Sequence, residues 1–148
     1  LIEIMVVLIL LSLSFMVFLQ ALNTGKSVRV NSEIRTIQAV LLNSMQQEIR
    51  ARKYDENSAS PWSQSLGPAE DETTVTNFDD IDDFHQYKIS SFSSYPAFSC
   101  SVAVNYADAS DGFHSTQSSP TNYKSIMVKI SHKTQPALTD TMIISSGF

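Results

Sequence analysis

The first 25 residues constrain this chain more than any other stretch. They carry a single charged side chain, Glu3, among residues that are mostly large and apolar. As an α-helix they would measure about 37 Å, more than the roughly 30 Å hydrocarbon core of a bilayer. A carboxylate so close to lipid costs on the order of 2–3 kcal/mol or more, so Glu3 is expected to have a functional partner. The plainer alternative is a simple membrane anchor with Glu3 at the level of the lipid headgroups.

The apolar stretch continues into an amphipathic one. Residues 23–25 (Asn-Thr-Gly) weaken a helix by about 0.5–1 kcal/mol each relative to alanine without interrupting it. Beyond them, apolar residues recur at spacings of three and four, the pattern of a helix that buries one face. The sequence therefore predicts one helix from about residue 2 to about residue 53, apolar all round over residues 1–25 and amphipathic over residues 26–53. The side chains predicted to pack this second half against the head are Ile34, Ile37, Leu41 and Met45.

The first seven residues, Leu-Ile-Glu-Ile-Met-Val-Val, resemble the start of mature type IV pilins and of type II secretion pseudopilins. That family has a prepilin-peptidase leader, then Phe-Thr-Leu-Ile-Glu and an apolar helix, so its pattern has two further residues before Leu1. The resemblance implies prepilin cleavage and methylation. It also implies that Glu3 neutralises the N-terminal ammonium of a neighbouring subunit during filament assembly. The residues it places in the helical core of the filament are Leu1, Ile2, Ile4, Met5, Val6, Val7, Leu8, Leu11, Phe15 and Phe18.

Three later stretches are similar to one group of minor pilins, the pilin-like proteins of mannose-sensitive-haemagglutinin-type pili. They are residues 54–57 (Tyr-Asp-Glu-Asn), residues 66–68 (Leu-Gly-Pro) with acidic residues following, and residues 78–85 (Phe-Asp-Asp-Ile-Asp-Asp-Phe-His). Together with the N-terminus, the resemblance covers roughly the first 90 residues. The remainder of the chain matches the family by architecture only.

Residues 54–148 are predicted to form a globular head. Residues 54–86 lack helical or strand periodicity and are rich in Ser, Pro, Asp and Glu, which is typical of an irregular loop. From residue 87 to 148, alternation of apolar and polar residues predicts about four antiparallel strands, most clearly over residues 98–106. The apolar face of such a sheet needs a cover, and the amphipathic half of the helix is available for it. We therefore expect an α+β fold, a long N-terminal helix packed on an antiparallel sheet of about four strands.

Charge and cysteine content exclude two kinds of feature. The formal net charge is −5, and residues 54–84 hold nine acidic side chains and no basic one. Phosphate binding needs clustered cations, so no nucleic-acid partner is expected. The single cysteine, Cys100, excludes an intrachain disulfide and is expected to be a small apolar core residue.

The acidic run at residues 79–83 leaves three uses open. Calcium binding is one hypothesis, because hard cations take several carboxylate oxygens from one loop, although the spacing is not that of an EF-hand. A solvated turn is the commoner use of adjacent carboxylates. A third use is capping, in which Asp79 or Asp82 accepts hydrogen bonds from the backbone of a short helical turn. The calcium ligands would be Asp79, Asp80, Asp82 and Asp83, and no other cofactor is expected.

The sequence contains no catalytic motif, so we do not expect an enzyme. It lacks a Gly-x-Ser-x-Gly elbow and a glycine-rich phosphate loop, and its three histidines are scattered. Two function classes remain open. The first is a structural subunit (pilin, minor pilin or pseudopilin) of a type IV pilus-like filament. The second is a membrane-anchored binding protein with a β-rich head that never polymerises.

Glu3 favours the filament subunit, because a plain anchor has no use for a carboxylate there. The expected partners are identical or related pilin subunits, the inner-membrane pilus or secretion assembly machinery, and the membrane before assembly. The expected location is the inner membrane first, then an extracellular filament on the cell surface or a pseudopilus that spans the periplasm.

Overall fold

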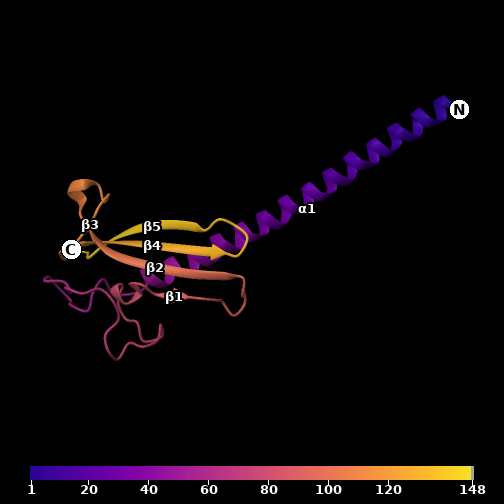
Figure 1. Cartoon of the computed structure of the whole chain (residues 1–148). Helices are drawn as coiled ribbons and strands as arrows, with labels where there is room; N and C mark the ends of the chain where they lie inside the picture. Colours follow the sequence, from indigo (N-terminus) through magenta and orange to yellow (C-terminus); the bar gives the residue numbers. More distant parts are fainter. Residues whose placement is uncertain (148) are drawn as a thin grey trace. The chain divides into compact units, whose positions relative to one another are not determined.

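The structure, a computed structural model, describes residues 1–147, and Phe148, the last residue of the predicted head, lies outside this range. A long N-terminal helix, α1 (Ile2–Arg50), packs its C-terminal part on a five-stranded antiparallel sheet (Figure 1). The predicted α+β fold class is therefore confirmed. The remaining elements are η1 (Asp82–Phe84), β1 (Lys88–Ile89), β2 (Phe98–Ala107), η2 (Ala109–Asp111), β3 (Thr116–Gln117), β4 (Tyr123–His132) and β5 (Leu138–Ser145).

The chain divides into two compact units, and the boundary between them falls within α1, after Thr36. The first unit is helix alone, and residues 1–33 are all exposed. The second unit contains the rest of α1, the sheet and the irregular residues 51–81. The change from apolar to polar residues near residue 25 therefore lies within the first unit.

α1 ends at Arg50 rather than near residue 53, because the backbone finds other hydrogen-bond partners. The Lys53 N–H donates to the Asp79 carbonyl at 3.2 Å, and the Lys53 carbonyl accepts from the Ile81 N–H at 3.0 Å. These two bonds form an isolated parallel bridge between Lys53 and Asp80. Backbone groups that pair with a distant segment are no longer available to continue a helix.

The sheet has the order β1-β2-β4-β5, with β3 paired to the end of β2. Strands β2 and β4 pair along their whole length, with Val102 opposite Val128. The alternation predicted for residues 98–106 is present, since every second side chain of β2 is buried. β3 exceeds the predicted number of strands, and its two residues are too few to show an alternating pattern. The buried apolar residues of β2 and β4 are Phe98, Cys100, Val102, Val104, Tyr106, Ala107, Ile126, Val128 and Ile130.

The buried face of the helix overlaps the predicted stripe but is rotated from it. Of the four residues predicted to pack there, Met45 is buried, but Ile34, Ile37 and Leu41 are only half-buried. The prediction counted apolar residues alone, whereas two of the five buried positions of α1 are glutamines, which rotates the buried face. The buried residues of α1 are Gln38, Leu42, Met45, Gln46 and Ile49.

The two buried glutamines bond the helix to the sheet side of the head. Gln38 Nε2 donates to the Ile130 carbonyl at 3.3 Å and to the Pro136 carbonyl at 3.2 Å. Gln46 Nε2 donates to Asp140 Oδ2 at 2.9 Å. An amide can be buried without a large cost when its donors are paired in this way. The glutamines thus fix the rotation of α1 about its axis as well as its contact with the sheet.

The rotation of the helix can be tested with three neighbouring substitutions. Leu42→Ala is expected to lower the free energy of unfolding of the head by about 2–4 kcal/mol, because Leu42 is buried. Leu41→Ala should cost clearly less, and the exposed Val40→Ala should change it by less than about 0.5 kcal/mol. Chemical denaturation of the full chain in detergent, followed by circular dichroism of the sheet, measures all three. A larger loss for Leu41→Ala than for Leu42→Ala would contradict the observed packing.

Candidate functional site

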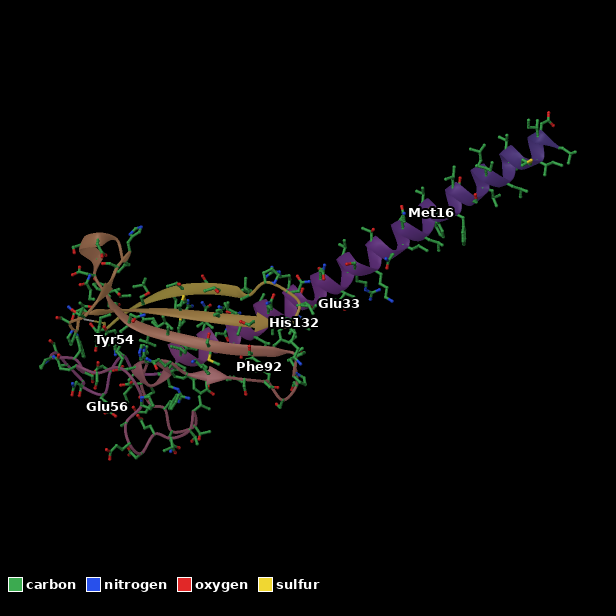
Figure 2. The ribbon with its side chains drawn as sticks, viewed as in Figure 1. Met16, Glu33, Tyr54, Glu56, Phe92 and His132 are labelled. Carbon is green, nitrogen blue, oxygen red and sulfur yellow. The ribbon has the colours of Figure 1, made fainter. Side chains whose placement is uncertain are left out.

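The apolar segment, residues 1–25, is the first candidate site. All ten residues predicted for a filament core expose half or more of their surface. Figure 2 shows side chains standing out all round this part of α1, including Met16. The helix is long and apolar enough to cross a membrane. An apolar surface on all sides of a helix is stable only in lipid or against other apolar surfaces.

Two serines within the apolar segment have their hydroxyl groups satisfied by the helix itself. Ser12 Oγ donates to the Ile9 carbonyl, and Ser14 Oγ donates to the Leu10 carbonyl, both at 2.8 Å. Such bonds to a preceding turn allow hydroxyl groups to enter an apolar environment. The serines therefore add no strongly polar surface to the segment, and Glu3 is left as its one charged side chain.

Glu3 lies in the first turn of α1. Among residues 1–147, no hydrogen bond or ion pair to its carboxylate is found. In an apolar environment the attraction between this carboxylate and a cation is many times stronger than in water. Glu3 is thus one carboxylate, able to bind a cationic group, in an apolar segment with no other charged side chain.

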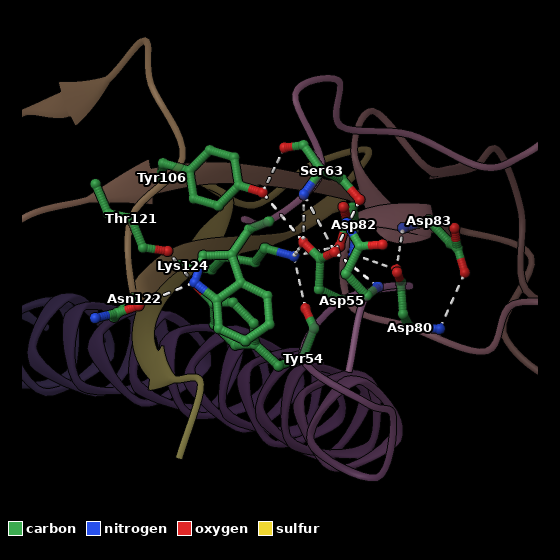
Figure 3. Close-up of polar contacts among 12 residues, drawn as sticks. Tyr54, Asp55, Ser63, Asp80, Asp82, Asp83, Tyr106, Thr121, Asn122 and Lys124 are labelled. Atoms are coloured by element: carbon green, nitrogen blue, oxygen red, sulfur yellow. Dashed lines mark hydrogen bonds and ion pairs between the residues drawn. The ribbon is translucent and has the colours of Figure 1, made fainter. Parts of the chain in front are cut away.

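A second polar site lies inside the head and was not predicted. We call it the Lys124 cluster, and Figure 3 shows its side chains converging on the Lys124 amine. Lys124 Nζ donates to the Tyr54 carbonyl at 2.6 Å, lies 3.1 Å from Asp55 Oδ2 and forms an ion pair with Asp82 Oδ1. The amine also lies 4.4 Å from the centre of the Tyr54 ring, within the range of a cation–π interaction. The members of the cluster are Tyr54, Asp55, Asp82, Tyr106 and Lys124.

Lys124 is buried because of its register in β4. It occupies the same alternating face of the strand as Ile126, Val128 and Ile130, all of which are fully buried. A signal for this position was present in the sequence, since residues two apart share one face of a strand. Sequence reasoning missed it because a lysine at a strand end is usually assigned to solvent.

Asp55 is held as an anion by several donors. Its carboxylate accepts from the Ser63 hydroxyl at 2.8 Å, the Ser63 N–H at 3.1 Å and the Asn57 N–H at 3.1 Å. The Tyr106 hydroxyl lies 3.2 Å from the same group. Burial pushes the pKa of Asp55 upward, but the donors from Ser63, Asn57 and Lys124 outweigh it and keep this pKa below its usual value.

The acidic run caps a short helical turn, although through a different residue from the two predicted. Asp80 Oδ1 accepts from the backbone N–H groups of Asp82 at 2.8 Å and Asp83 at 3.3 Å, at the start of η1. Asp79 instead pairs with Lys53 Nζ at 2.7 Å. Asp80, Asp82 and Asp83 are buried, so the solvated-turn interpretation is wrong for these three residues.

The four carboxylates proposed as calcium ligands have different partners in this structure. Asp83 Oδ2 accepts from the N–H groups of Asp79 at 3.0 Å and Asp80 at 3.1 Å, and Asp82 is paired with Lys124. The acidic side chains whose oxygens come within 4.8 Å of one another are Glu56, Glu72 and Asp79, and Glu56 is exposed. Calcium binding by Asp79, Asp80, Asp82 and Asp83 stays a prediction.

Comparisons of the chain with protein-family models, curated proteins and solved structures found no match. The function therefore has to be inferred from the chemistry of these two sites. The apolar segment offers a surface for lipid or for other apolar helices. The Lys124 cluster offers a buried amine between two carboxylates.

Asp80 makes the stability of the head dependent on pH. Burial raises its pKa to about 8, with further contributions from the charges of Asp82 and Asp83. In the unfolded chain it would titrate near 4, so between these values the folded state holds one more proton. The stabilisation is complete below pH 4 and is lost as pH rises through 8, by at most about 1.4 kcal/mol per pH unit.

Asp80→Asn should remove this dependence, because an amide keeps the acceptor oxygen and stays neutral at every pH. We expect the variant to be more stable than the wild type at pH 9 and to show a smaller loss of stability between pH 6 and pH 9. Urea unfolding of the full chain in detergent at both pH values measures this. The control is Asp71→Asn, since Asp71 is exposed. Identical pH profiles for Asp80→Asn and the wild type would refute the raised pKa.

Proposed function

We propose that this chain is a structural subunit of a type IV pilus-like filament and that it polymerises through its N-terminal helix. The subunit is a pilin, a minor pilin or a pseudopilin, and it has no enzymatic activity. The observation that carries the proposal is Glu3, the single charged side chain of the exposed apolar segment, residues 1–25. The resemblance of the first seven residues to mature pilins supports the same reading.

The all-round apolar surface supports assembly because it needs neighbours on every side. In a membrane, lipid covers the segment. Outside the membrane, only other apolar helices can replace that cover, and identical or related subunits supply them. Burial of apolar surface contributes about 25 cal/mol per Å², so a segment with this much exposed surface can stabilise a polymer strongly.

Glu3 gives this otherwise non-directional association a register. In lipid its carboxylate is poorly solvated and has no partner of its own chain among the described residues. The N-terminal ammonium of an incoming subunit would neutralise it in a low-dielectric environment. Only one axial stagger of two parallel helices brings these groups together. For a buried pair such specificity is often worth more than the net stabilisation.

The proposed location follows from this order of events. The subunit first resides in the inner membrane through the apolar segment, which is able to span it. Assembly machinery for a pilus or for secretion then moves it into a filament on the cell surface or across the periplasm. In this proposal the head, including β2, β4 and β5, determines what the filament contacts.

Substitution of Glu3 tests the proposal in cells that carry the native assembly machinery. Glu3→Ala and Glu3→Gln are expected to lower the amount of subunit in sheared filaments about tenfold or more, which corresponds to about 1.4 kcal/mol. Glu3→Asp should be intermediate, since its carboxylate reaches about one carbon less far. Membrane fractions should contain all variants at wild-type levels.

The matched control is Glu33→Gln, which removes an exposed carboxylate that pairs with Arg29 on the same helix. It should enter filaments at the wild-type level, because an exposed pair one helical turn apart contributes little. Wild-type incorporation of Glu3→Ala would contradict the pairing mechanism and favour the alternative, a membrane-anchored binding protein that does not polymerise.

A further inference from the structure

The Lys124 cluster holds an amine against a carboxylate in a site that is almost closed to solvent. The side chains of Lys124 and Asp55 are fully buried, and that of Asp82 is 4% exposed. Burial of two ions of opposite sign carries a desolvation cost, which their attraction offsets only where the geometry is good and further hydrogen bonds satisfy both groups. Asp55 and Asp82 are both distant in sequence from Lys124. Their contacts therefore join the irregular residues 51–81 and η1 to strand β4.

We propose that Lys124 and Asp82 become joined by an isopeptide bond between Lys124 Nζ and Asp82 Cγ. The resulting amide replaces two buried charges by one neutral group that needs only ordinary hydrogen bonds. The proposal concerns the head alone and does not depend on filament assembly.

Of the two carboxyl groups at the amine, Asp82 is the better electrophile. Asp55 accepts bonds from Ser63 and Asn57, and these donors stabilise its anionic form. The Asp82 carboxylate accepts a hydrogen bond from Lys124 itself and shares one with the side chain of Asp80. Asp82 is therefore the carboxyl group better suited to be attacked, and Asp55, whose Oδ2 lies 3.1 Å from the amine, is placed to exchange protons with it.

The reaction is a condensation that balances without any other reactant. The Lys124 ammonium gives a proton to Asp55, and the neutral amine attacks Cγ of Asp82 to form the C–N bond. One C–O bond of Asp82 breaks, and its oxygen leaves as water with two protons that came from the amine. Asp55 passes these protons from nitrogen to oxygen and ends as the carboxylate it began as.

Proximity and exclusion of water favour the amide over its hydrolysis. Groups held in contact react as if present at about 10⁵–10⁸ M, which offsets the cost of joining two separate molecules. The water released diffuses away from a cluster that is almost fully buried, so little water is present there to hydrolyse the amide.

The link would strengthen the part of the head with the least regular structure. Residues 51–81 contain no helix or strand in the described structure, and the chain has one cysteine, so no intrachain disulfide can tie them down. Segments held by few backbone ladders open locally at low free energy. A covalent bond from η1 to β4 would restrain that opening.

Tryptic mapping of the purified full chain, as produced in its native host, tests the proposal. Without a link, trypsin releases residues 54–88, 89–124 and 125–129 as separate linear peptides. With it, cleavage after Lys124 is blocked, and residues 54–88 appear joined to residues 89–129 at about 18 Da, one water, below the sum of their masses. Fragmentation should place the branch at Asp82 and Lys124. Separate linear peptides at full mass would refute the bond, as would a loss of water confined to one linear peptide.

Variants identify the two partners. Lys124→Met and Asp82→Ala should abolish the branched peptide, whereas Lys129→Arg, an exposed position on the same strand, should retain it in full. A branched peptide that persists in Asp82→Ala would overturn the assignment to Asp82 and indicate Asp55. The wild-type map is decisive even where a variant fails to fold.

Discussion

The main physical constraint on this protein is the exposed apolar surface at the N-terminal end of α1. The side chains of residues 1–33 are exposed around the whole helix, and apolar ones dominate the first 22 positions. Farther along, the same helix is buried on one face through Leu42, Met45 and Ile49. One continuous element thus has two environments, a folded head and a surface that only lipid or other helices can satisfy. In the proposed filament, pairing with Glu3 would select one axial register among the many in which apolar helices can pack.

The head depends on a polar core as well as on an apolar one. Gln38 and Gln46 orient the helix on the sheet, and Lys124 joins the irregular residues 51–81 to β4. Removal of one partner from such a buried network leaves an unpaired polar group or charge, which costs more than the intact contact contributes. These groups therefore specify how the pieces of the head fit together. An isopeptide bond at Lys124 would make one of these contacts permanent.

Periodic patterns predicted the long helix and an antiparallel sheet, although not β3, because burial of apolar side chains dictates both the helix and the longer strands. The polar contacts could not be predicted in this way. Gln38 and Lys124 carry no apolar signal that would predict their burial, yet tertiary partners make it favourable. The acidic run was expected to serve as a metal loop, a solvated turn or a cap. The cap is Asp80 rather than Asp79 or Asp82, since capping depends on local backbone geometry that no spacing in the sequence specifies.

Electron cryomicroscopy of material sheared from cells that express the chain tests the central claim most directly. A helical polymer is expected, with residues 2–22 packed helix to helix at its core and the Glu3 carboxylate within ion-pair distance of a neighbouring N-terminus. Intact chains found only as monomers in membranes or micelles, with the native assembly machinery present, would contradict the claim.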